Sequence, residues 1–67
     1  MTKTNREIRD LAIVLALANG KSVKEIAARL NVSYKGTQQY INRLRRKTET
    51  HTVAHLVAHY LRNNLIP

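Results

Sequence analysis

The sequence predicts an all-α fold, a four-helix domain of the helix-turn-helix type with the third helix as the recognition helix. Apolar residues recur every three or four positions through most of the chain, which is the spacing of one helix face. Residues that cap helices precede these segments, and the one proline is the last residue, so no proline interrupts a helix. The expected helices lie at about 5–19, 22–30, 34–47 and 52–63, in a single domain of residues 1–67.

The composition favours a negatively charged partner. Twelve Lys and Arg against four Asp and Glu give a formal net charge of +8, which suits nucleic acid or an anionic membrane surface. The membrane is the weaker alternative, because the longest apolar run, residues 11–18, is far shorter than the roughly 20 residues that span a bilayer. We expect a cytoplasmic protein without membrane contact. With no cysteine in the chain, we expect no disulfide and no thiolate metal site.

The first predicted helix follows a capping box, in which Thr4 can accept from the Glu7 amide while the Glu7 side chain reaches back. It ends before Gly20. One face carries Ile8, Leu11, Ala12 and Leu15, and well round from it lie Ile13 and Leu17. We therefore expect this helix to be buried on more than one side.

The second predicted helix is short and is followed by a tight turn. Ser22 and Glu25 form a second capping box, and the apolar residues that follow are Ile26, Ala27 and Leu30. In the turn, Asn31 tolerates a left-handed backbone, Val32 is expected to be an apolar plug, and Ser33 is the next N-cap. A short helix, a turn and a capped helix together predict a helix-turn-helix.

The third predicted helix separates its polar residues from its apolar ones. The face expected to be buried carries Tyr34, Thr37, Ile41, Leu44 and Thr48. The opposite face carries Lys35, Gln39, Asn42 and Arg46, flanked by Gln38 and Arg43. Gln and Asn can bond in pairs to adenine and Arg to guanine, and Lys and Arg neutralise phosphates. This face predicts DNA contact, although many surface helices carry such residues without that role.

Two features of this helix allow more than one interpretation. A basic run at its end, Arg43 and 45–47, is often only a solvated face, but at the end of a recognition helix it favours phosphate contact. Gly36 costs about 1 kcal/mol of helix propensity relative to Ala. It either lets the first turn approach a phosphate or base closely, or it is tolerated near a frayed end.

A longer pattern runs from Gly20 to Ile66 without a gap. Its members are Gly20, Ser22, Lys24-Glu25-Ile26-Ala27, Leu30, Val32-Ser33, Ile41, Leu44, Lys47, Val57 and Leu65-Ile66. This pattern resembles the LuxR/NarL/GerE-type DNA-binding domain. The chain departs from that domain at Gly36-Thr37 (usually Thr-Val), Tyr40 (often His), Thr48-Glu49 (Leu-Gly) and Asn64 (Gly).

The resemblance implies a four-helix bundle whose third helix enters the major groove and whose fourth helix mediates dimerisation on a two-fold related site. It implies that Gln38, Gln39 and Asn42 contact bases, which agrees with the polar face described above. The expected phosphate contacts are Lys24, Lys35, Arg43, Arg46 and Lys47.

The fourth predicted helix carries a broad apolar stripe and three histidines. The residues expected at a dimer interface are Val53, Leu56, Val57 and Tyr60, unless the whole stripe is core. His51, His55 and His59 recur every four residues, a spacing that can place two imidazoles on one metal. The chain has no cysteine and no obvious carboxylate to complete a site, so we expect no metal and no cofactor.

The sequence therefore predicts a bacterial or phage transcriptional regulator that binds duplex DNA as a homodimer. Enzyme function is not expected, because the chain has one Asp, no Cys and no nucleophile-base or phosphate-loop spacing. The alternative is a protein-interaction module derived from a helix-turn-helix, which would bind a partner through its apolar first or fourth helix. Either could stand alone or be part of a larger protein.

Overall fold

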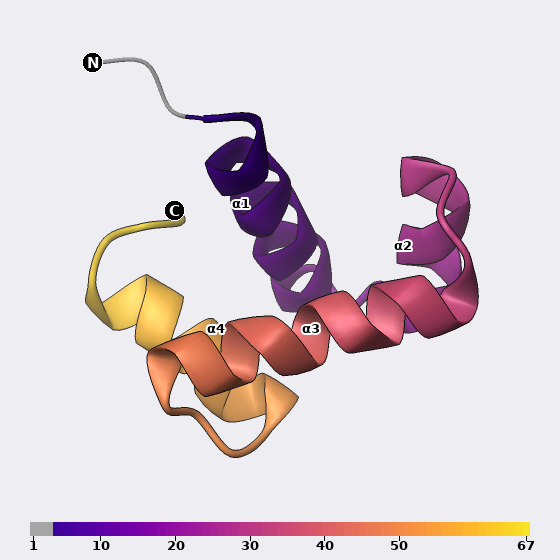
Figure 1. The fold of residues 1–67 in the computed structure, drawn as a ribbon. Helices are drawn as coiled ribbons and strands as arrows, with labels where there is room; N and C mark the ends of the chain where they lie inside the picture. Colours follow the sequence, from indigo (N-terminus) through magenta and orange to yellow (C-terminus); the bar gives the residue numbers. More distant parts are fainter. Residues whose placement is uncertain (1–3) are drawn as a thin grey trace.

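The all-α fold is confirmed. The computed structural model describes residues 4–67, and the first three residues of the expected domain lie outside that range. The helices in the described part are α1 (Asn5–Ala18), α2 (Val23–Leu30), α3 (Tyr34–Thr48) and α4 (Val53–Arg62). Each helix end lies within one residue of its expected position. In Figure 1, α3 lies across one side of the molecule, with α2 near its N-terminal end and α4 near its C-terminal end.

Side-chain caps begin these helices. At α2 the full capping box is present, because Ser22 Oγ accepts from the Glu25 N–H and Glu25 Oε1 accepts from the Ser22 N–H, both at 3.1 Å. At α1 the Glu7 N–H donates to Thr4 Oγ1 at 3.1 Å, but the Glu7 carboxylate accepts from the Thr4 hydroxyl. The return bond to the Thr4 amide, which the sequence suggested, is therefore replaced by a bond between side chains.

Left-handed backbone ends two helices and follows the other two, where Gly20 (φ 82°) comes after α1. Asn31 has φ 58° at the end of α2, as expected for the turn. Glu49 (φ 56°) ends α3 and Asn64 (φ 55°) follows α4. Both are positions at which the resembled domains usually carry glycine. The backbone conformation is therefore the one that glycine favours, although the residues differ.

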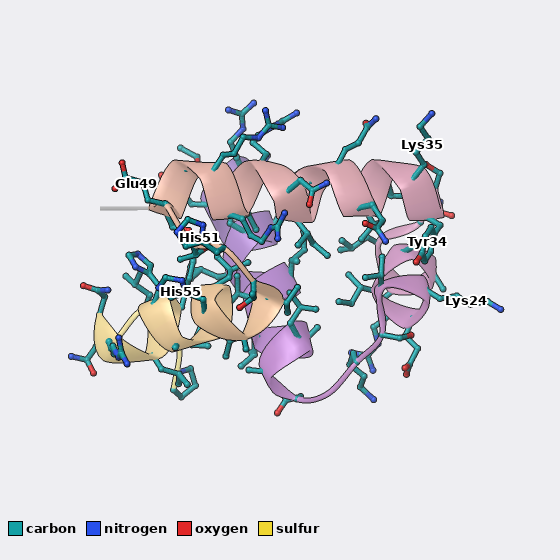
Figure 2. All side chains as sticks on the ribbon, turned by 90° about the horizontal axis from the view of Figure 1, so that it is seen from below. Lys24, Tyr34, Lys35, Glu49, His51 and His55 are labelled. Atoms are coloured by element: carbon teal, nitrogen blue, oxygen red, sulfur yellow. The ribbon has the colours of Figure 1, made fainter. Side chains whose placement is uncertain are left out.

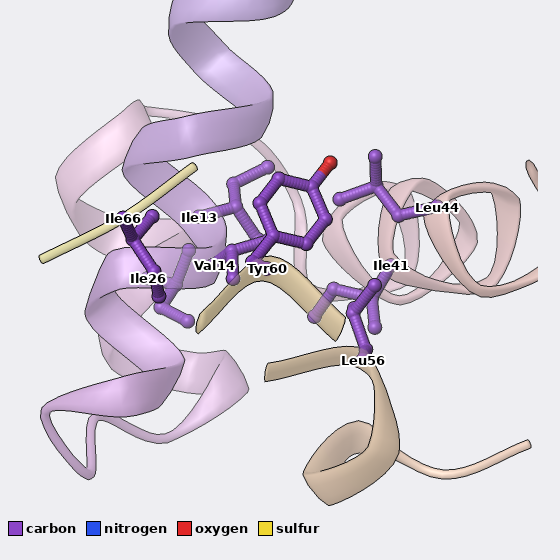
Figure 3. Packing of buried hydrophobic residues seen from close by; sticks show 8 residues of the cluster. All are labelled: Ile13, Val14, Ile26, Ile41, Leu44, Leu56, Tyr60 and Ile66. Carbon is purple, nitrogen blue, oxygen red and sulfur yellow. The ribbon is translucent and has the colours of Figure 1, made fainter. Parts of the chain in front are cut away.

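The core lies where the four helices and the C-terminal segment meet. The buried apolar side chains shown in Figure 3 are Ile13, Val14, Ile26, Ile41, Leu44, Leu56, Tyr60 and Ile66. In that view the Tyr60 ring lies between Ile13 of α1 and Leu44 of α3. Fully burying such aliphatic or aromatic side chains stabilises a fold by roughly 1.5–3 kcal/mol each. This core fixes which face of α3 points outward.

Helix α1 is buried against the core over much of its circumference, since Leu11 of one expected face and Ile13 and Leu17 of the other all pack there, but it is not covered all round. Its buried residues are Asp10, Ile13 and Val14, whereas Ile8 is 52% and Leu15 38% exposed. Helix α1 packs against α4 and α2, and these short helices do not surround it. The exposed residues leave an apolar strip on its other side.

Two smaller expectations near the turn are also wrong. Tyr34 is exposed because it is the first residue of α3, where the helix extends beyond the core. Val32 is not a buried plug, since more than a third of its surface is exposed.

Candidate nucleic-acid interface

The face of α3 that turns away from the core carries three amide side chains. Thr37, Ile41 and Leu44 are buried, and helical geometry then directs the opposite residues outward. Gln38, Gln39 and Asn42 are all exposed. Amides can donate and accept at the same time, which is the property that reading a base edge requires.

The N-terminal turn of α3 depends on Gly36 for a reason that neither sequence interpretation included. Ser33 caps the helix by accepting from the Gly36 N–H at 2.9 Å. A Cβ at Gly36 would lie 3.0 Å from Ser33 Oγ and 3.1 Å from Val32 Cγ1. The small residue therefore leaves room for the cap and for the turn.

Cations flank the amides toward both ends of α3. Lys24, Lys35, Arg43 and Arg46 are exposed. In Figure 2, Lys35 and Tyr34 project from opposite sides of the N-terminal end of α3, and Lys24 projects from α2 at the same end of the molecule. The Arg43 guanidinium carbon lies 5.6 Å from the centroid of the Tyr40 ring, within the range of a cation–π contact. This arrangement suits a polyanion that follows the helix.

Lys47 is placed differently from the other expected phosphate contacts. Its Nζ lies 3.7 Å from Asp10 Oδ2, and the two side chains are 62% and 6% exposed. Asp10 also affects two tyrosines. Burial is the largest cause that raises the pKa of Tyr40, and a hydrogen bond with Asp10 and the negative charge of Asp10 raise it further. Burial and the Asp10 charge raise the pKa of Tyr60 as well.

The structural role of Asp10 was not among the features predicted from the sequence. A signal was present, since the chain's one Asp stands three and four residues before two buried apolar residues, Ile13 and Val14, on the same helix. A small cavity of about 120 Å³ adjoins the ion pair, and its lining includes Glu7, Asp10, Leu11, Lys47, Tyr60 and Leu65.

Two further side chains hold the amides of α3. Gln38 Nε2 lies 3.0 Å from the Tyr34 hydroxyl. Arg45 donates from Nη2 to Asn42 Oδ1 at 3.2 Å and from Nη1 to the His51 carbonyl oxygen at 2.9 Å. Sequence reasoning placed Arg45 only in the general basic run. The spacing of three residues between Asn42 and Arg45 was the available signal, because such residues are neighbours on a helix.

Helix α4 offers less surface for a dimer than expected. Leu56 is 0% and Tyr60 6% exposed, so their assignment to a dimer interface is wrong: both lie in the core of the single chain. Val53 is exposed and Val57 is half-buried, and Leu61 is exposed one turn further on. These three recur every four residues and therefore share one strip.

The histidines of this region form a pair and a separate residue. The His51 N–H donates to His55 Nδ1 at 3.3 Å, and the two ring centroids lie 6.0 Å apart. His59 lies against Tyr60 instead, with the ring centroids 5.9 Å apart. Within residues 4–67, no three His, Cys, Asp or Glu side chains gather as a metal site would require.

Helices α2 and α3, the turn at residues 31–33 and the cation-flanked amides together define a helix-turn-helix domain of the nucleic-acid-binding kind. The model of the luxR family of bacterial regulatory proteins, GerE, matches residues 3–60, and the chain belongs to this family.

Among curated proteins, the chain is similar to the probable transcriptional regulator ycf29 of Cyanophora paradoxa, with 39% identity over 64 residues. The match covers 96% of this chain and 30% of that protein, so the chain spans under a third of the relative's length. No solved structure matches the chain. In the part of the chain that the structure describes, no helix combines the length and apolar character needed to cross a membrane.

Proposed function

We propose that the chain is a sequence-specific, duplex-DNA-binding transcriptional regulator that inserts α3 into the major groove. The observation that supports this most strongly is the outward face of α3, where three exposed amides lie between exposed cations while the opposite face is fixed in the core. Gln38, Gln39 and Asn42 read bases, and Lys24, Lys35, Arg43 and Arg46 contact phosphates. Lys47 contributes less, because Asp10 already holds it. The family and the name of the relative support the same function. A cytoplasmic location belongs to the proposal, because the protein would act where the DNA is.

Selection of bound sites from a random duplex library tests this proposal. A short recurring motif is expected, because base contacts on α3 discriminate by about 1–3 kcal/mol per good amide or guanidinium pair. Binding without any recurring motif, after repeated rounds at physiological salt, would contradict sequence-specific recognition.

The proposal includes a homodimer through the exposed strip of α4. Its residues are Val53, Val57 and Leu61 in place of the buried pair that sequence reasoning had included. A small domain gains affinity and half-site selectivity when two copies bind together. Sedimentation with the selected duplex should show two protein chains bound to each duplex. The double variant Val53→Glu with Leu61→Glu should show one bound chain per duplex. Two chains bound equally well by the double variant would contradict this interface.

One observation favours a second candidate, a protein-interaction module. Ile8 and Leu15 leave an exposed apolar strip on α1. The double variant Gln39→Ala with Asn42→Ala distinguishes the two functions. If this variant folds but loses activity, the result supports base reading by α3. Activity that survives this change and is lost in Ile8→Glu with Leu15→Glu supports the interaction module.

A further inference from the structure

Arg45 differs from Arg43 and Arg46 because its guanidinium donates hydrogen bonds within the described part of the chain. It bonds at once to Asn42 Oδ1 on its own helix and to the His51 carbonyl oxygen in the segment before α4. Its Nε atom is buried and has no hydrogen-bond partner in the described part of the chain. A group held in this way is poorly placed to contact a phosphate.

The segment that Arg45 contacts is itself held in place. The Thr50 N–H donates to the Arg45 carbonyl oxygen at 2.8 Å, and Thr50 is buried. One residue on, the His51 N–H donates to His55 Nδ1 at 3.3 Å. Figure 2 shows His51 and His55 close together between α3 and α4. The Nη1 group of Arg45 therefore bonds to a carbonyl oxygen that is held in place, and this limits the positions that its Nη2 group can take.

The contact determines which end of the Asn42 amide is free. A guanidinium has donors only, so the amide atom that faces Arg45 has to be the carbonyl oxygen Oδ1. The bond takes one of the two acceptor positions of Oδ1 and holds that end of the amide toward Arg45, so the Nδ2 group is the end turned away and available to an outside ligand. By contrast, the Tyr34 hydroxyl can donate or accept, so its contact with Gln38 fixes no such polarity.

We infer that Arg45 is a specificity-determining positioning residue, which occupies Asn42 Oδ1 so that Asn42 meets a base edge as a donor through Nδ2. The inference rests on the proposed function. Paired bonding to adenine needs an amide oxygen to accept from N6 and an amide nitrogen to donate to N7. A donor-only amide instead matches guanine, which offers the acceptors N7 and O6. Asn42 in this chain therefore favours guanine, where an unconstrained asparagine favours adenine.

Site selection with four proteins tests this inference. Asn42→Ala identifies the base pair that Asn42 reads, as the position whose preference disappears. The natural chain should prefer guanine at that position. Arg45→Ala should move the preference toward adenine by about tenfold, because the freed oxygen can accept again. The matched control is Arg46→Ala, an exposed neighbour, which should weaken binding to all sequences and leave the preferred base unchanged.

A combined variant distinguishes positioning from general structural damage. If Arg45 acts through Asn42, then adding Arg45→Ala to Asn42→Ala should alter no base preference further. Arg45→Met retains the aliphatic packing of the side chain and gives the same test if Arg45→Ala does not fold, as judged by circular dichroism. Both substitutions should spare preferences at the other positions of the site.

The results that would overturn the inference are separate from failure of the proposed function. A folded Arg45 variant that keeps the natural preference at the Asn42 position overturns the inference alone. A natural chain that selects no sequence at all overturns both. A shift of preference from guanine to adenine at that position, absent from the Asn42→Ala background, supports it.

Discussion

The two halves of α3 present their polar side chains in different ways. In the N-terminal half, residues 34–40, Lys35 and Gln39 are exposed and form no hydrogen bond or ion pair with other described side chains. In the C-terminal half, residues 41–48, Arg45 is bonded to Asn42 and Lys47 is paired with Asp10. The C-terminal half therefore carries more cations, and more of these cations already contact other groups of the protein.

This difference shows that a count of cations overstates the charge that is available to a ligand. Of the basic run at the end of α3, Arg43 lies over Tyr40, Arg45 faces the loop, and Lys47 faces a buried carboxylate. Arg46 is exposed and makes no such contact within residues 4–67. The following changes test the comparison between the two halves, from the largest expected effect to the smallest.

Removing one amide from each half should have the largest effect. In Gln39→Ala with Asn42→Ala, the ratio of the affinity for the selected duplex to the affinity for a scrambled duplex should fall by roughly 100-fold. The reason is that each amide bonded to a base contributes about 1–3 kcal/mol of discrimination. The fold should persist because both side chains are exposed. Competition binding measures the ratio, and circular dichroism provides the control. An unchanged ratio in the folded variant would contradict base reading by α3.

Arg46 and Lys47 should differ although they are adjacent cations. Arg46→Ala should reduce the salt dependence of DNA binding by about one phosphate contact, a change near 0.9 in the slope of log K against log salt. Lys47→Ala should reduce it by less, because its ammonium is shared with Asp10. Binding titrations at several salt concentrations measure both slopes. Equal reductions would show that the ion pair does not restrain Lys47.

Asp10→Asn should release Lys47 toward the DNA. A few-fold gain in affinity for any sequence is expected, with a steeper salt slope, because an extra cation becomes available. The pKa of Tyr40 should fall part of the way to its ordinary value, because burial still raises it while the effect of the Asp10 carboxylate is gone. Tyrosine absorbance during an alkaline titration measures this. Unchanged affinity together with an unchanged salt slope would contradict competition between Asp10 and phosphate.

The two ends of α3 should respond differently to changes at their unusual backbone positions. Glu49→Gly should increase the free energy of unfolding by up to about 1 kcal/mol, because Glu49 occupies left-handed backbone at φ 56°. Gly36→Ala should give no comparable gain, since its Cβ would crowd Ser33 Oγ at 3.0 Å and offset the better helix propensity. Urea unfolding measures both. Stabilisation by Gly36→Ala with none from Glu49→Gly would reverse the expected order.

Local features of the fold could be predicted from the sequence because their causes are local. The caps at Ser22 and Ser33 and the left-handed Asn31 depend on residues within a few positions, and all three are present. The outward face of α3 followed from helical periodicity alone. Periodicity could not decide which side of α1 packs, because Ile8 and Ile13 are equally apolar and only the neighbouring helices distinguish them.

The contacts of the candidate site were less predictable because they join distant segments. Lys47 pairs with Asp10, thirty-seven positions earlier in the chain, and residue type alone did not indicate this pairing. Leu56 and Tyr60 could equally have been core or interface, and the packing against α1 and α3 places them in the core. Arg45 lay in a run of similar residues, so only the position of the His51 carbonyl distinguishes it from its neighbours.

The central claim is that the exposed amide face of α3 contacts duplex DNA. Titrating isotope-labelled protein with the selected duplex, while following the side-chain amide and methyl resonances by nuclear magnetic resonance, tests it most directly. We predict that the resonances of Gln38, Gln39 and Asn42 shift together, whereas Ile8 and Leu15 on the apolar strip of α1 change little. The largest shifts on the α1 strip, with the α3 amides unmoved, would contradict the account.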